Sequence, residues 1–155
     1  MLTTEQLQAI ADDPRAFLSR NYRIEERIQT KRRRIEHLRA VVTATTQEIK
    51  AVVSYTGPSD KVSNCVVETL DLEKEIQGEI EALQQTQRDT AEAIELLVDD
   101  VNMKMLLELR YLACMHWEEI ATEMNYALRW VMRLHKRALN TMRKEASALC
   151  PEIRS

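Results

Sequence analysis

Glycine and proline are almost absent from this chain, and that scarcity limits its fold more than any other feature. The 155 residues include only two glycines and three prolines. β-Sandwiches and barrels need a turn roughly every 8 to 12 residues, and their turns depend on these two residue types. At 45% hydrophobic and 30% charged residues, the chain is also too apolar for disorder. The sequence therefore predicts an all-α protein built of long amphipathic helices.

Two heptad patterns predict a long antiparallel helical hairpin, a coiled coil, within residues 1–98. The patterns run through residues 24–52 and 62–97, and most of their core positions are apolar. Between them, residues 54–60 contain the one Gly-Pro pair of the chain, where we expect the hairpin turn. We expect a homodimer formed through the hairpin, and the exposed heptad seams leave open whether it contacts another protein instead.

The N-terminal segment is expected to fold as a short helix that precedes the hairpin. Residues 3–13 begin with a Thr-x-x-Gln capping box at Thr3, and Pro14 suits the first turn of the long helix that follows. The segment lacks the basic and apolar regions of a leader, and no stretch of about 18 apolar residues occurs. We expect no membrane partner and a cytoplasmic location, which the three widely spaced cysteines also fit.

Charge is strongly segregated along the chain, although the net charge is only −3. Residues 60–100 hold twelve acids and three cations, whereas residues 20–39 hold eight cations and three acids. Two antiparallel helices would set these faces side by side, and the ion pairs would fix the register. The alternative is two solvated faces with no net interaction. Residues 125–144 carry six cations and no acid, which favours a local anion-binding surface.

Residues 99–146 have the pattern of a three-helix unit that contains a helix-turn-helix, followed by a tail at 147–155. Short apolar blocks span residues 101–114, 117–124 and 128–142. The gap Asn125-Tyr126-Ala127 has helix-turn-helix length, and asparagine tolerates the left-handed conformation that a sharp turn needs.

The second helix of this motif carries the candidate binding site. Its inner side is expected to hold Val131, Leu134 or His135, Ala138 and Met142, facing Ile120, Ala121 and Met124 of the first helix. Guanidinium groups about one turn apart can reach guanine edges or phosphates in a major groove. The candidate DNA-binding residues are those left outside: Arg129, Trp130, Arg133, Lys136 and Arg137.

A solvated face of a terminal helix would also explain these cations. The turn spacing, the small residue at the helix crossing and the lack of acids favour DNA binding instead. Trp117 opens a helix after a turn and is expected in the core. Trp130 is expected either to pack or to contact thymine methyl groups or sugars.

The stretch from Arg110 to Met142, RYLACMHWEEIATEMNYALRWVMRLHKRALNTM, resembles small phage regulators of the RinA and ArpU late-activator type. Its end is similar to the promoter-contacting region 4 of bacterial sigma factors, and the resemblance extends upstream to residues 22–39 and 59–76. It implies a supporting helix at 117–124, a recognition helix at 128–143 and a phage transcriptional regulator that acts in a bacterial host cell, with RNA polymerase as a further partner.

One position departs from the pattern of that family. Ala127 stands where serine or threonine usually opens the recognition helix, which forfeits an N-cap worth roughly 1 kcal/mol. The helix start would then fray, or Asn125 would cap it.

Catalysis and metal binding find little support in the sequence. His37, His116 and His135 are scattered, Cys114 and His116 alone make no metal site, and the two glycines make no phosphate loop. We expect no enzyme activity, no catalytic residue, no metal and no cofactor. The remaining alternatives to a transcription regulator are a phage terminase small subunit, which would form a ring that packages DNA, and a coiled-coil adaptor without DNA affinity.

Overall fold

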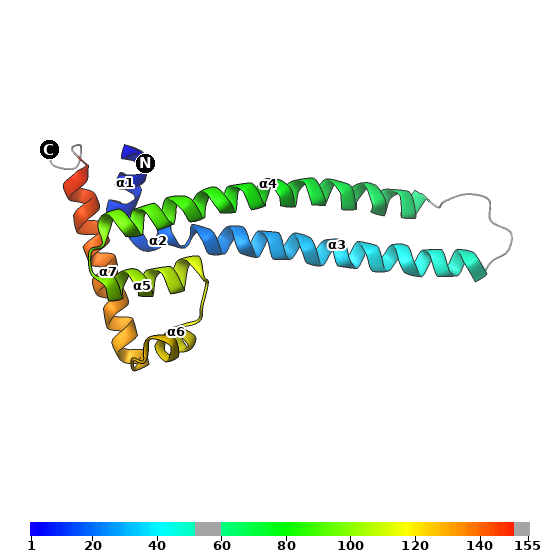
Figure 1. Cartoon of the computed structure of the whole chain (residues 1–155). Coiled ribbons are helices and arrows are strands. Elements are labelled where there is room, and N and C mark those ends of the chain that lie inside the picture. The colour runs from blue at the N-terminus through cyan, green and yellow to red at the C-terminus, as the bar shows by residue number, and fades with distance from the viewer. Residues whose placement is uncertain (52–59, 151–155) are drawn as a thin grey trace. The chain divides into compact units, whose positions relative to one another are not determined.

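The computed structural model of the chain describes residues 1–51 and 60–150, apart from the side chains of residues 46, 48–51 and 60 (Figure 1). All of the described elements are helices, which confirms the predicted all-α class. In chain order they are α1 (Thr4–Asp12), α2 (Pro14–Leu18), α3 (Arg20–Ala51), α4 (Asp60–Leu97), α5 (Val101–Leu107), the π-helical segment η1 (Glu108–Leu112), α6 (Trp117–Met124) and α7 (Leu128–Leu149).

Contacts divide the chain into two compact units, to both of which α3 and α4 contribute. We call Ile24–Leu83 the paired-helix unit, and Met1–Arg23 with Gln84–Ser155 the terminal unit. The pattern of the sequence predicts a boundary between residues 98 and 99 instead. The difference has a physical reason: the heptad pattern of α4 continues without a break to Leu97, but Ala93, Ile94 and Leu97 in its last turns pack in a core cluster with residues of α1, α2, α5 and α7.

The N-terminal helices begin where their capping residues predict. The Thr3 hydroxyl accepts a hydrogen bond from the backbone N–H of Gln6, and the Gln6 side chain accepts one from the backbone N–H of Thr3. The Asp13 carboxylate caps α2 through the backbone N–H of Ala16. The long helix expected from Pro14 is interrupted, however, because α2 ends at Leu18 and α3 begins at Arg20.

Helix α7 is central to the terminal unit, where it contacts α1, α2, α5 and α6. The larger core cluster brings together buried apolar residues from both ends of the chain and from the end of α4. The smaller cluster joins α5, α6 and the first turns of α7. The larger comprises Ile10, Phe17, Leu18, Ala93, Ile94, Leu97, Val98, Leu107, Tyr111, Ala138, Met142 and Ala146, and the smaller Leu106, Ile120, Ala121, Val131 and Leu134.

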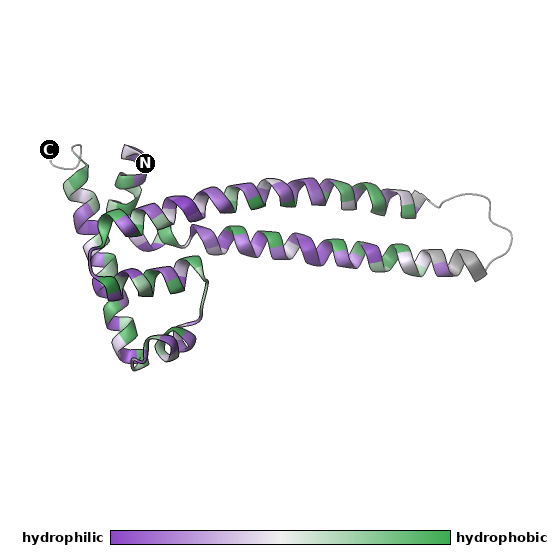
Figure 2. Ribbon diagram, viewed as in Figure 1, coloured by the Kyte–Doolittle hydropathy of each residue, from purple (hydrophilic) through white to green (hydrophobic). Residues whose placement is uncertain are grey.

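In the paired-helix unit, α3 and α4 lie side by side and antiparallel, around a narrow core. Ile28 and Ile35 of α3 pack with Ile76 of α4. Along both helices, long hydrophilic stretches alternate with shorter apolar ones (Figure 2). The predicted hairpin turn at residues 54–60 lies outside the described residues, except that α4 begins at Asp60.

Ion pairs join the basic face of α3 to the acidic face of α4, as the charge pattern predicts. Lys31 Nζ lies 2.8 Å from Glu79 Oε1 and 3.4 Å from Glu75 Oε2. Its hydrogen bond holds the pKa of the Glu79 carboxyl below its ordinary value. The other pairs are Arg27 with Glu79, Arg34 with Glu68 and Arg39 with Glu73. The basic face of α3 and the acidic face of α4 are therefore in contact.

Among the described residues, no helix combines the length and the apolar character that crossing a bilayer requires.

Candidate nucleic-acid interface

Helix α7 is amphipathic, with one buried and one exposed face. Its buried residues recur at the three- and four-residue spacing of one helix face, and they include every inner position that the sequence predicts. Both Leu134 and His135 are buried, so the choice left open between them is resolved in favour of both. The buried residues are Val131, Leu134, His135, Ala138, Met142 and Ala146.

A tight turn with a left-handed residue separates α6 from α7. Asn125 has φ 58° and ψ 38°, as expected for this position. Its backbone N–H donates to the Thr122 carbonyl at 3.2 Å, and that of Tyr126 donates to the Ala121 carbonyl at 3.0 Å. This pair of bonds is the Schellman arrangement that ends many helices. Ile120 and Ala121 are buried beneath it, which confirms the predicted crossing of the two helices.

The first turn of α7 lacks a side-chain cap. Ala127 is its N-cap residue and makes no side-chain hydrogen bond, as the departure from the family pattern implies. Asn125 ends α6. A helix N-terminus without a cap leaves backbone N–H groups to solvent or to an external acceptor.

The outer face of α7 holds all five residues that the sequence predicts as DNA-binding. Arg129, Trp130, Arg133, Lys136 and Arg137 are all exposed. At about 100° per residue, the four cations share one side of the helix. None of the ion pairs formed between described residues involves a cation of α7.

The exposed basic surface extends past the five candidate residues and includes all six cations of residues 125–144. Helix α7 continues to Leu149, beyond the expected end at Arg143 and into the expected tail, and Asn140, Arg143 and Lys144 are exposed along it. With the earlier cations they lie within an arc of about 120°. Arg143 and Lys144 join this face because α7 keeps its helical period past Arg137. We call Arg129, Arg133, Lys136, Arg137, Arg143 and Lys144 the cationic face of α7.

A buried histidine fixes the opposite face of α7 to its support. His135 Nε2 and Tyr111 Oη share a hydrogen bond of 2.7 Å, and the Trp117 ring lies 4.6 Å from the His135 ring. Burial, with the charges of Arg15 and Arg110, lowers the pKa of His135 to about 4. Burial raises the pKa of Tyr111 to about 12. Both groups are therefore neutral near pH 7, and Trp117 packs as expected.

The π-helical segment η1, which carries Tyr111, is held in place by residues of α3. A π-helix shifts backbone hydrogen bonds by one residue, as in the 3.0 Å bond from Ala113 N–H to the Glu108 carbonyl. Within the terminal unit, Asn21 Nδ2 donates to the Tyr111 carbonyl at 2.9 Å, and the Tyr22 hydroxyl donates to the Arg110 carbonyl. No feature of the sequence analysis indicated this segment.

The side chain of Arg110, on η1, contacts the segment before α6 and the first residue of α6. Its guanidinium carbon lies 4.4 Å from the centre of the Trp117 ring and 5.1 Å from that of Tyr22. Its Nη1 donates to the Met115 carbonyl at 2.9 Å. Arg110 thus has a structural role and is only partly exposed, whereas the cations of α7 are exposed to solvent.

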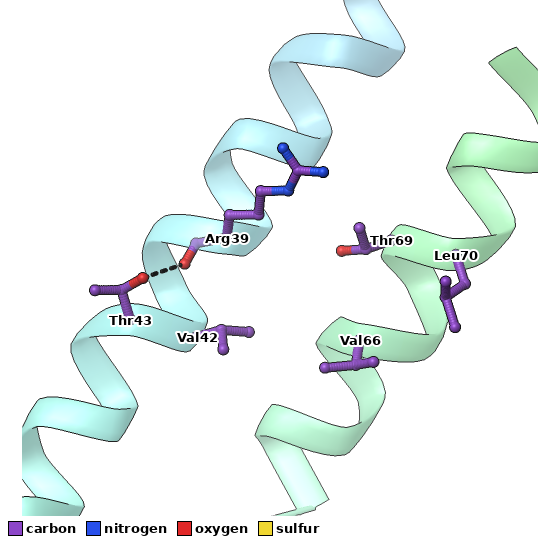
Figure 3. Close-up of a pocket in the computed structure, with 6 residues that line it drawn as sticks. All are labelled: Arg39, Val42, Thr43, Val66, Thr69 and Leu70. Atoms are coloured by element: carbon purple, nitrogen blue, oxygen red, sulfur yellow. Dashed lines mark hydrogen bonds between the residues drawn. The ribbon is translucent and has the colours of Figure 1, made fainter.

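A groove of about 350 Å³ in the paired-helix unit offers a surface of another character (Figure 3). Val42, Val66 and Leu70 give it apolar walls, and Arg39 and Thr43 lie at its edge, where the Thr43 hydroxyl donates to the Arg39 carbonyl at 2.9 Å. Lined in this way, it resembles a contact surface more than a reaction site.

Cys65, Cys114 and Cys150 are present as thiols. Among the described residues, no three His, Cys, Asp or Glu side chains come together as a metal site would need.

Comparison of the chain with protein-family profiles, with curated proteins and with solved structures finds no match.

Proposed function

We propose that this protein binds double-stranded DNA sequence-specifically by inserting α7 into the major groove. The observation that carries the proposal is the cationic face of α7. It has six cations, and no ion pair between described residues involves any of them. A generic solvated helix usually mixes both signs of charge, whereas residues 125–144 contain no acid.

The dimensions of α7 fit this role. A helix with its side chains is about 10–12 Å wide, and the major groove of B-DNA is about 12 Å wide. Arg129 and Arg137 are separated by about 12 Å along the axis at 1.5 Å per residue, which corresponds to a few base pairs. Helix α6 would cross the DNA backbone and support α7, as in other helix-turn-helix units.

We further propose that the DNA binding serves transcription, in the cytoplasm of a bacterial host. This step depends on the resemblance of residues 110–142 to phage late activators and to region 4 of sigma factors. RNA polymerase is the partner that such an activator would contact. We also propose that the chain forms a homodimer through the paired-helix unit. The groove there and the exposed Val66, Val67 and Leu70 of α4 support it, because exposed apolar clusters on monomers mark contact surfaces.

The test combines a binding titration with a measurement of mass in solution. Binding to random duplex DNA is followed while the salt concentration rises, and light scattering after size exclusion gives the oligomeric state. A monomer or dimer whose affinity falls steeply with salt is the expected result, with a slope of about −0.9 in log K against log salt for each phosphate contacted. A large ring would favour DNA packaging, and a lack of affinity at low salt would leave only the adaptor.

A further inference from the structure

Large apolar side chains are exposed on the first turns of α7, beside its cations. Leu128, Trp130 and Met132 retain 42%, 43% and 43% of their accessible surface. A single exposed apolar residue is ordinary, but three within five positions of one helix are an unusual local concentration.

The exposed apolar groups occupy only part of the length of α7. Beyond Met132, the next large hydrophobic residue exposed on this helix is Leu149, at its end. The cations, in contrast, continue from Arg129 to Lys144, about 22 Å at 1.5 Å per residue. The apolar side chains are thus confined to the turns that a helix-turn-helix brings closest to the bases.

The helical period places two of these residues at one edge of the cationic face. At about 100° per residue, Leu128 and Met132 lie one turn apart and about 40° from each other around the axis. Arg129 is the neighbour of this pair within the cationic face. Trp130 lies at the opposite edge, away from this pair. Leu128 and Met132 therefore form an apolar strip next to the guanidinium groups.

The chemistry of the major groove supplies one apolar group that such a strip can contact. Each base pair shows donors and acceptors there, and thymine adds its C5-methyl group. Phosphates, which attract the neighbouring cations, offer nothing to an apolar side chain. We propose that Leu128 and Met132 bind thymine methyl groups, so that the preferred DNA site of this protein contains thymines whose methyl groups contribute to affinity. This inference rests on the proposed function.

The test replaces thymine with deoxyuridine, which lacks only the C5-methyl group. Duplexes that the full chain prefers are first selected from a random pool, and each thymine of a selected site is then replaced in turn. Because burying one methyl group is worth about 0.8 kcal/mol, we expect affinity to fall about fourfold at one or more positions. In Leu128→Ala or Met132→Ala, affinity for the thymine duplex should fall and the difference between thymine and deoxyuridine should disappear.

Two control variants separate this contact from general effects. Arg143→Gln should weaken binding to both duplexes alike and keep their ratio. Leu96→Ala alters another exposed apolar residue of the terminal unit, on α4, and should change neither affinity nor ratio. Circular dichroism verifies that each variant is folded, which we expect because Leu128 and Met132 lie outside the core clusters.

Equal affinity for thymine and deoxyuridine at every position, with specific binding intact, would overturn the inference and leave the proposed function standing. A thymine preference that survives both alanine substitutions would overturn the assignment to these residues. Failure to bind any duplex would overturn the inference and the proposed function together.

Discussion

The basic segments of α3 and α7 have similar charge in the sequence and different surroundings in the structure. Residues 20–39 hold eight cations, and residues 125–144 hold six. On α3, four cations form ion pairs with carboxylates of α4. On α7, none of the cations shares an ion pair with a described residue. The comparison teaches that a count of cations does not measure a binding surface, because neighbouring acids decide how many remain available.

The largest effect we expect is on the stability of the fold that holds α7 in place, and it depends on the buried His135. The pKa of His135 is about 4 in the folded chain and about 6.5 when unfolded, so only the unfolded chain binds the proton between these values. Stability is therefore complete above about pH 6.5 and falls as the pH drops toward 4, by at most about 3 kcal/mol. Urea unfolding at several pH values measures the loss.

One variant separates His135 from the carboxylates, which also titrate in acid. His135→Gln should flatten the pH dependence between pH 6.5 and 4, whatever its effect at neutral pH. An equally steep loss in His135→Gln would show that His135 is not the group responsible.

The next prediction concerns base recognition by α7. Arg133 is exposed on the outer face within the first turns of the helix. We expect Arg133→Ala to weaken binding to a selected site by about 1 to 3 kcal/mol and to affect random duplexes less. Competition between selected and random DNA measures the ratio. An equal loss on both would assign Arg133 to the phosphates.

A smaller effect is expected at Lys136, on the same face. An ammonium group on a flexible stem suits a phosphate better than a pair of base acceptors. Lys136→Ala should weaken binding to all sequences alike and reduce the salt slope by about one unit. A loss confined to the selected site would contradict this division between Lys136 and Arg133.

The smallest effect is expected on α3. Arg34 and Glu68 form an ion pair in which both side chains are about half exposed, 51% and 46%. Arg34→Gln should lower the free energy of unfolding by less than about 1 kcal/mol and leave DNA affinity unchanged. Thermal unfolding and a binding titration measure the two quantities. A clear loss of affinity would mean that the paired cations also reach DNA, which would break the comparison.

The sequence predicted best what depends on local periodicity. The inner face of α7, the left-handed Asn125 and the Thr3 capping box all follow from spacing within a few residues. The cation–carboxylate pairing of α3 and α4 was also predictable, because segregated charge extends over long stretches. All six cations of the cationic face were counted from the sequence, and the same period, continued past Arg137, places Arg143 and Lys144 beside the other four.

Features that depend on distant contacts escaped the sequence analysis. The break at Ser19 separates α2 from α3, and the adjacent Phe17 and Leu18 are buried in a core completed by residues from the other end of the chain. The π-helical turn of η1 is held by side chains of residues 21 and 22, which are remote in sequence. The unit boundary within α4 also depends on which helices cover its last turns. None of these has a local pattern.

The most direct test of the central claim compares charge-matched variants of the two basic segments. Arg129→Gln/Arg133→Gln removes two cations from α7, and Arg34→Gln/Arg39→Gln removes two exposed cations of α3 that pair with Glu68 and Glu73. Binding to duplex DNA is titrated across salt concentrations for both variants and for the unaltered chain. We predict that the α7 variant binds more weakly and with a salt slope shallower by about two units, whereas the α3 variant keeps both affinity and slope. Equal losses in the two variants would contradict the claim that α7 is the DNA-binding surface.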